Sequence, residues 1–266
     1  GRSWTVVHDE QVKGQGCWTG ADCGPRRAVS KGEGSGLGTK QLVVGVIGLL
    51  LYLFLVPALL FVAAGTLSWP MAWVYVALLL ASTVGSRLIV FKRNPDTLRE
   101  RARFTSSEGT KSWDRVLVMI VGLFGPMVVA IVAGLDHRWA WSAVVPLGVQ
   151  IAGALVIAGG YGLAVWAMVE NAYFSSVARI QEDRAQKVVS TGPYRIVRHP
   201  SYAGAVVAAL ALPFMLDALW ALIPAAMLGA VLVIRTALED RMLSDELQGY
   251  RRYMERTRYR LVPGLW

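Results

Sequence analysis

The stretch LVVGVIGLLLYLFLVPALLFVAAG occupies residues 42–65 and contains no charged side chain. A helix rises about 1.5 Å per residue, so one of this length would cross the roughly 30 Å hydrocarbon core of a bilayer. Three further apolar stretches, each of about 20 residues or more, are Trp69–Phe91, Val116–Leu135 and Trp141–Val169. The sequence therefore predicts a membrane protein that crosses the bilayer several times.

Two shorter apolar stretches follow and predict a helical hairpin. They are Tyr202–Leu216 and Ala218–Ile234, and they meet at Asp217. Pro213 and Pro224 are expected to kink its arms, because proline removes a helical hydrogen bond. Together with the four longer stretches, they give about six spans. We therefore predict an all-α fold, a polytopic membrane helix bundle whose last two spans form a short hairpin.

The composition supports a membrane protein and argues against a nucleic-acid-binding one. Hydrophobic residues make up 55% of the chain and charged residues only 17%, with a mean hydropathy of +0.45. A soluble domain carries roughly a quarter charged residues. The net charge of +9 would suggest nucleic acid in a soluble chain, but no basic stripe interleaves with aromatic residues here. We interpret the positive charge as loops that face anionic lipids.

The lysines and arginines also predict the orientation. They gather in residues 1–40, 92–115, 171–200 and 235–260, whereas the other connections between apolar stretches hold only Arg138. Basic loops stay on the cytoplasmic side of a membrane. The alternation therefore predicts a multi-pass integral membrane protein with both termini in the cytoplasm.

Three regions follow from this pattern. Residues 1–40 form a Gly-rich tail that is expected to be disordered, because it has little apolar surface to bury. Residues 41–170 hold the first transmembrane helices, and residues 171–266 hold a loop, the hairpin and a C-terminal tail. Cys17 and Cys23 fit no metal or redox spacing, so we predict no metal site.

The side chains that suggest chemistry begin at QEDRAQKVV (residues 181–189) and continue in TGPYRIVRHPSYAG (residues 191–204). Gly192-Pro193 favours a turn, and Pro200 favours the start of a helix. The free backbone N–H groups of that helix start suit an anionic ligand group, and Arg195, Arg198 and His199 add donors. The alternative is a basic loop that contacts lipid headgroups.

A second group lies where the hairpin returns to the same side. Arg235 and Glu239 are four residues apart, so they share one face of a helix and can bind a common ligand or each other. Ionisable groups at the end of an apolar span are costly and commonly functional. The alternative is a membrane anchor with an ordinary ion pair. The basic and aromatic tail, residues 249–266, either covers a pocket or lies on the membrane.

These motifs together resemble the isoprenylcysteine carboxyl methyltransferases, which share their core with the phospholipid methyltransferases. The shared pattern is Gly-Pro-Tyr, Arg-His-Pro-x-Tyr-x-Gly, Arg-x-x-x-Glu with a following acidic residue, Gly-Tyr-x-x-Tyr and a terminal Pro-Gly, over residues 181–266. Asn94-Pro95 and residues 109–114 resemble the bacterial members of the family. The resemblance thus implies location in a bacterial inner membrane.

The family resemblance also implies S-adenosyl-L-methionine as the methyl donor. Arg235 is then expected to orient the substrate, and Arg235 and Glu239 to be catalytic. Family members often have His where this chain has Gln186, so we assign no general base to that position. The implied cofactor contacts are Gln181, Gln186, Lys187, Val188, Val189, Tyr194, His199, Pro200, Ser201, Tyr202 and Glu239.

Methyl transfer from a sulfonium needs alignment and exclusion of water, and it needs no metal. A carboxylate acceptor would need only Arg235 to hold it, whereas a thiol or amine would also need a proton acceptor, Glu239 or Asp240. The predicted partners are membrane lipids and a lipophilic or small-molecule methyl acceptor. Two alternatives remain: an NADPH-dependent sterol-type reductase, because such reductases resemble the family near their C-terminal end, and a non-catalytic lipid-binding protein.

Overall fold

Helices account for all the regular structure in the computed structural model, which describes residues 39–93 and 109–266. The predicted N-terminal tail with Cys17 and Cys23, and the Asn94-Pro95 motif, lie outside these residues. The main helices are α1 (Thr39–Ala64), α2 (Pro70–Arg93), α4 (Ser112–Met119), α5 (Gly125–Trp139), α6 (Leu147–Glu170), α7 (Pro200–Met215), α8 (Leu222–Glu246) and α9 (Tyr250–Arg256).

The helical segments confirm the predicted polytopic bundle. Within the described residues, five are long and apolar enough to cross a membrane: Val46–Ala64, Pro70–Arg93, Ser112–Trp139, Leu147–Glu170 and Leu219–Glu246. Helix α7 is also apolar but has only 16 residues. Each of the six predicted apolar stretches therefore corresponds to a helix, and the chain is a multi-pass membrane protein.

The hairpin differs from the prediction in its second arm. Its turn lies at Asp217, where φ is +53°, and α7 is short as expected. Helix α8, however, has 25 residues and continues past the predicted end at Ile234 as far as Glu246. The extension carries charged residues whose partners lie elsewhere in the fold. Pro224 lies in the first turn of α8, where its missing N–H breaks no helical hydrogen bond.

Prolines explain two further differences from the predicted boundaries. Helix α6 begins at Leu147 rather than Trp141, directly after Pro146, whose backbone is extended. The third predicted span consists of α4 and α5 joined by a π-helical turn at Ile120–Phe124. Pro126 follows that turn and lacks the N–H that an α-helix would pair with Gly122. The local widening accommodates the missing donor.

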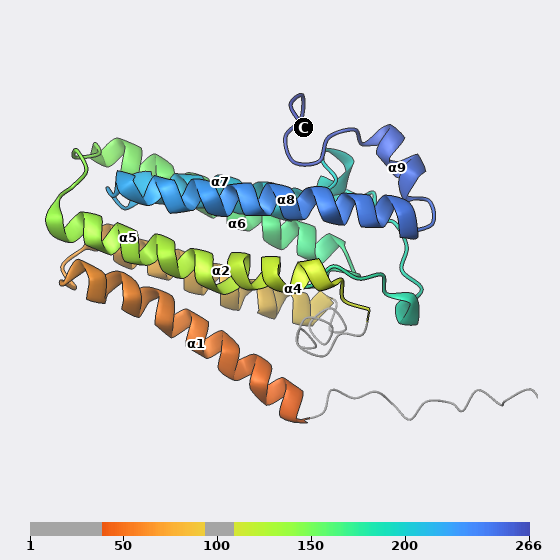
Figure 1. Cartoon of the computed structure of the whole chain (residues 1–266), viewed down its shortest axis with the longest axis horizontal. Coiled ribbons are helices and arrows are strands. Elements are labelled where there is room, and N and C mark those ends of the chain that lie inside the picture. The colour runs from red at the N-terminus through yellow and green to blue at the C-terminus, as the bar shows by residue number, and fades with distance from the viewer. Residues whose placement is uncertain (1–38, 94–108) are drawn as a thin grey trace, which may run out of the picture. The chain divides into compact units, whose positions relative to one another are not determined.

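Helix α6 packs along α7, α7 packs along α8, and α1 packs mainly on α5 (Figure 1). Gly160 on α6 and Gly204 on α7 meet at the first of these crossings, where a Cβ added to Gly160 would lie 2.5 Å from the Gly204 carbonyl oxygen. Gly153 is also pressed against α7, whereas Gly159 and Gly162 have open space around them. Gly153 and Gly160 therefore permit the close packing of α6 against α7.

Gly204→Ala is expected to destabilise the protein by about 1–3 kcal/mol, because its methyl group would collide with the Gly160 carbonyl. Gly159→Ala is the matched control, since a Cβ there meets nothing and should raise stability by up to about 1 kcal/mol through helix propensity. Unfolding of both variants in detergent would check this. Equal stability of the two variants would contradict the close crossing.

At the other end of the bundle, Asp136 holds the turns that carry the tip of the hairpin. Its carboxylate accepts hydrogen bonds from the Ser142 hydroxyl at 2.6 Å and from the backbone N–H groups of Ser142 and Trp220, both at 2.9 Å. Asp217 accepts a hydrogen bond from the Val145 N–H. These contacts hold the start of α8 against α5 and the turn after it. They thereby fix the position of α8 along the bundle.

Candidate functional site

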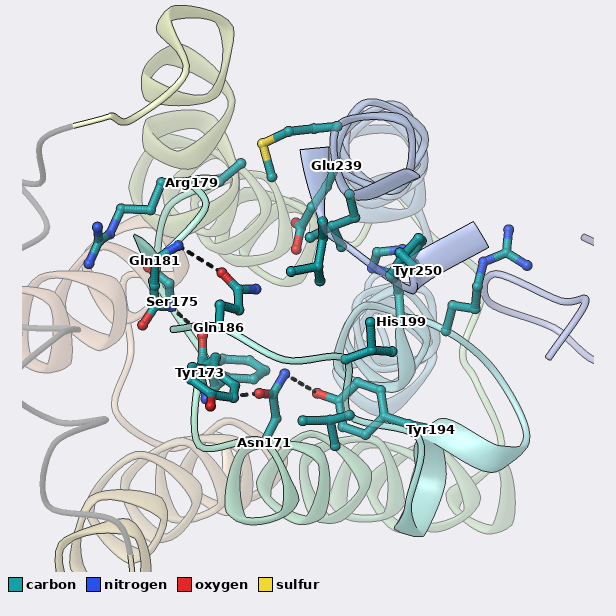
Figure 2. A pocket seen from close by; sticks show the side chains of 18 of the residues that line it. Asn171, Tyr173, Ser175, Arg179, Gln181, Gln186, Tyr194, His199, Glu239 and Tyr250 are labelled. Carbon is teal, nitrogen blue, oxygen red and sulfur yellow. Dashed lines mark hydrogen bonds between the residues drawn. The ribbon is translucent and has the colours of Figure 1, made fainter. Parts of the chain in front are cut away.

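A pocket lies where α6 ends, α7 begins and α8 ends (Figure 2). One wall is the segment that follows α6, residues 171–189, and the opposite wall is the end of α8 from Glu239 to Leu247. The start of α7 and the tyrosines Tyr194, Tyr250 and Tyr253 close the third side. The site is therefore built from two stretches that are distant in sequence, residues 171–202 and 239–253.

The structure brings together nearly all the residues predicted to contact a cofactor. The predicted residues that line the pocket are Gln181, Gln186, Lys187, Val188, Val189, Tyr194, His199, Ser201, Tyr202 and Glu239. Pro200 is buried at the start of α7 and does not line the pocket, and neither does Arg235. The shared location agrees with a common site, and the role of each residue remains a prediction.

Gln181 organises the wall that follows α6. It is only 1% exposed, its side-chain Nε2 donates to the Tyr173 carbonyl at 2.6 Å, and its Oε1 accepts from Arg184 at 2.7 Å. Its backbone N–H donates to Oε1 of Gln186 at 2.8 Å (Figure 2). Both ends of the Gln181 amide are thus used within the protein, so it shapes the wall, and Gln186 fixes the loop that carries it.

Asp240 is the centre of a buried polar cluster behind the pocket. It is 1% exposed and forms a bidentate pair with Arg198, at 2.7 and 2.8 Å. Its carboxylate also accepts from Arg260 at 2.8 Å and from the Tyr250 hydroxyl at 2.9 Å, and the His199 Nε2 lies at 3.2 Å. Two guanidinium groups stabilise its ionised form, so Asp240 is poorly suited to the predicted alternative role of proton acceptor.

The partners of Asp240 keep the protonation states that this cluster requires. Burial lowers the pKa of Arg198, but its hydrogen bond and charge interaction with Asp240 outweigh this and raise the pKa overall. Burial, followed by the Asp240 charge, holds the pKa of the Tyr250 hydroxyl above its ordinary value. Burial likewise raises the pKa of Tyr253 to about 12. Arg198 therefore stays charged, and both tyrosines stay hydrogen-bond donors at neutral pH.

Arg198 also holds the C-terminal segment against the turn before α7. Its Nη1 donates to the carbonyls of Thr257 and Arg258, at 2.8 and 2.6 Å. The backbone N–H groups of Arg198 and His199 donate to the carbonyls of Tyr259 and Arg260, both at 2.9 Å. Residues 257–260 lie against the turn before α7 and do not line the pocket, so the covering role of the tail stays a prediction.

Arg235 pairs with Asp114 rather than with Glu239. Its Nε and Nη2 donate to the two carboxylate oxygens of Asp114 at 2.7 and 3.1 Å, and Nη2 also donates to the Ser176 carbonyl at 3.0 Å. Glu239 instead accepts from the Tyr202 hydroxyl at 2.6 Å, and the Arg235 guanidinium lies over the Tyr202 ring. The sequence alternative of an ordinary i,i+4 ion pair is therefore wrong.

Asp114 is the residue that the sequence reasoning missed. It is 0% exposed, and besides pairing with Arg235 it accepts a hydrogen bond from the Ala178 N–H at 2.6 Å. It therefore ties α4, the pocket wall and α8 together. A carboxylate in the first turn of a span was a visible signal, but its partner 121 residues away was not.

The sequence of this part of the chain matches a known family. Residues 149–248 match the family model for phospholipid methyltransferases, and this range includes most of α6, the pocket loop, α7 and α8. No curated protein matches the sequence. The match confirms the predicted resemblance and implies methyltransferase activity for a membrane protein.

The polar side chains of the pocket determine which kinds of ligand it can bind. Among residues 39–93 and 109–266, no group of three His, Cys, Asp or Glu side chains is placed to hold a metal ion. The pocket offers one carboxylate, Glu239, and neutral polar groups such as Ser201 and Tyr202. These groups can bind a cation and orient an uncharged or anionic acceptor.

Proposed function

We propose that this membrane methyltransferase transfers the methyl group of S-adenosyl-L-methionine to a lipophilic or small acceptor at the cytoplasmic membrane face. The observation that carries the proposal is that three motifs converge on one pocket. They contribute Gln186–Val189, then His199, Ser201 and Tyr202, and finally Glu239. A basic loop that only contacted lipid headgroups would not need to enclose a carboxylate and a helix start together.

The chemistry of the pocket fits the proposed cofactor. The amides in the first turn of α7, at Ser201 and Tyr202, have no helical acceptor and would hold a carboxylate together with His199. Glu239 would stabilise the positive charge of a sulfonium. Leu243, Leu247 and Tyr173 offer apolar and aromatic surface for a purine ring. When bound, the cofactor supplies an electrophilic methyl group.

The residues around Glu239 would then handle the acceptor. The Tyr202 hydroxyl holds one carboxylate oxygen of Glu239, and the other has no hydrogen bond within the described residues. Glu239 can thus take a proton from an amine or thiol acceptor. Nη1 of Arg235 likewise has no hydrogen bond there, so it could orient a carboxylate acceptor while Asp114 fixes the rest of the group. The acceptor classes are therefore carboxylate, thiol and amine.

The membrane face follows from the charges around the pocket. The stretches 171–200 and 235–260 are basic and end at the pocket, whereas the turns near Asp136 and Asp217 are nearly free of lysine and arginine. The positive-inside rule then supports a cytoplasmic pocket. The same rule supports both termini in the cytoplasm, and the family resemblance supports a bacterial inner membrane.

Binding of S-adenosylhomocysteine to the detergent-purified chain, measured by isothermal titration, tests the proposal. We expect saturable binding that weakens about tenfold or more in Glu239→Gln, which keeps the shape of the side chain and removes its charge. Glu255→Gln, at an exposed position on α9, should bind like the unsubstituted protein. Absence of binding by the folded, unsubstituted chain would overturn the proposed cofactor.

A parallel thermal-shift comparison separates the alternatives. Stabilisation by NADPH but not by S-adenosyl-L-methionine would favour the sterol-type reductase. Stabilisation by neither ligand, with cellular function intact in Glu239→Gln, would favour a non-catalytic lipid-binding protein. Transfer of a labelled methyl group into membrane extract, with the product identified by mass, would then identify the acceptor.

A further inference from the structure

A second cavity, of about 170 Å³, lies between the helices of the bundle, is partly open, and shares no lining residue with the functional site. Its walls come from α1, α2, α5, α6, α7 and α8, at positions well inside the predicted spans. Aliphatic side chains such as Ile157, Leu212 and Leu228 form most of the surface. Three tyrosines, Tyr52, Tyr75 and Tyr161, add the polar groups.

Tyr75 is the most unusual of these residues. It is only 4% exposed and belongs to the buried apolar core, yet its hydroxyl has no hydrogen-bond partner among the described residues. Every fully enclosed side-chain oxygen or nitrogen in that part of the chain does have a partner. The Tyr75 oxygen must therefore retain accessible surface, and the surface within reach is the cavity that Tyr75 lines.

The other two tyrosines of the cavity share this property. Tyr52 and Tyr161 pack against the core cluster that contains Tyr75, and neither hydroxyl has a hydrogen bond within the described residues. The tyrosines around the functional site behave differently. Tyr202 donates to Glu239 at 2.6 Å and Tyr253 donates to the Tyr194 carbonyl at 2.6 Å. Tyr52 and Tyr161 are only partly buried, whereas Tyr75 is buried. A hydroxyl without a protein partner in an apolar core indicates a ligand or an ordered water.

Small residues on α7 create the space beside these hydroxyls. Ala205, Ala208 and Ala209 all line the cavity, where larger side chains would fill it. A cavity of roughly 150 Å³ lined only by apolar side chains accepts benzene. The cavity here is slightly larger and contains three potential donors, so it can hold a ring-sized group that also accepts a hydrogen bond.

We propose that this cavity is a binding site for an uncharged, membrane-soluble molecule whose buried part is ring-sized and carries a hydrogen-bond acceptor such as a carbonyl oxygen. Hydroxyl donors inside an apolar wall select for an acceptor. No Lys, Arg, Asp, Glu or His lines the cavity, so a charged ligand would leave its charge unpaired. The site is independent of the proposed methyl transfer.

Acetophenone and α-methylstyrene are suitable probes, because they have the same shape and differ in one carbonyl oxygen. Ligand-observed NMR would measure the affinity of both for the detergent-purified full chain, with empty detergent micelles as the blank. We expect the chain to bind acetophenone about three- to tenfold more tightly, the selectivity of one hydrogen bond. Equal affinity for the two probes would overturn the proposal.

Tyr75→Phe assigns this selectivity to the cavity. The preference for acetophenone should disappear while the affinity for α-methylstyrene stays within about twofold. Ala209→Leu, which fills the cavity, should lower the affinity of the chain for both probes. Because the Tyr75 hydroxyl has no protein partner, Tyr75→Phe should not lower the melting temperature of the probe-free protein. A lower melting temperature would indicate a site for structural water only and would overturn the proposal. A preference that survives both in Tyr75→Phe and in the variant in which Tyr52, Tyr75 and Tyr161 are all replaced by Phe would mean that the selectivity arises outside this cavity, and would also overturn it.

Discussion

Asp240→Ala is expected to lower the free energy of unfolding by about 3–5 kcal/mol and to abolish binding of S-adenosylhomocysteine. Removal of the carboxylate leaves the buried guanidinium of Arg198 without its counter-charge, and it removes the acceptor of the Tyr250 hydroxyl. His199 would also lose the group that fixes its ring beside the pocket. Chemical unfolding and isothermal titration of the same preparation would measure both effects.

Asp245→Ala provides the matched control on the same helix. Asp245 is 53% exposed, and its ion pairs with Arg251 and Arg241 lie at 3.3 and 4.0 Å in contact with solvent. Exposed pairs of this kind contribute about 0–1 kcal/mol. The control should therefore unfold and bind nearly like the unsubstituted protein. If Asp240→Ala behaved like Asp245→Ala, the buried cluster would not be organising the site.

Asp114→Ala should also lower the free energy of unfolding by about 3–5 kcal/mol, because it leaves the buried Arg235 unpaired. It should also weaken binding of S-adenosylhomocysteine, since Asp114 holds the Ala178 N–H and thereby the pocket wall that contains Val177 and Ala178. Unfolding and titration would again be measured together. The largest change in hydrogen exchange should fall on residues 175–178.

Glu246→Gln is the corresponding control, because its ion pair with Lys111 also joins the start of α4 to α8 but is partly exposed. We expect Glu246→Gln to lower the free energy of unfolding by no more than about 1 kcal/mol and to leave the binding of S-adenosylhomocysteine unchanged. If both variants lost similar amounts of stability and affinity, any contact between α4 and α8 would be enough to hold the site. That result would contradict a specific role for Asp114.

The sequence was sufficient to predict the helices but not all of their ends. Long apolar stretches must be helical in a bilayer, because every backbone polar group needs an internal partner. The C-terminal end of α8 was not predicted, because hydropathy marks Arg235, Glu239 and Asp240 as too polar for a membrane span. Their charges are offset by Asp114, Tyr202 and Arg198, which hydropathy along the chain cannot reveal.

The site was predictable as a set of residues and not as a set of contacts. The ordered motifs placed His199, Tyr202 and Glu239 in one family pattern, and the structure brings them to one pocket. Which side chains face the ligand and which support others depends on three-dimensional packing. Gln186 bonds the Gln181 backbone, and Asp240 binds two arginines, although the sequence suggested neither pairing.

The hydrogen bonds from Arg198 and His199 to residues 257–260 have a consequence for biosynthesis. A ribosome makes those four residues after the whole of α8, so the membrane insertion machinery has received every described span before they emerge. A nascent chain arrested before Thr257 would contain all the described spans. It would still lack residues 257–260, whose carbonyl groups accept the hydrogen bonds from Arg198 and His199. The turn before α7 can therefore reach its final set of hydrogen bonds only after α8 has been synthesised.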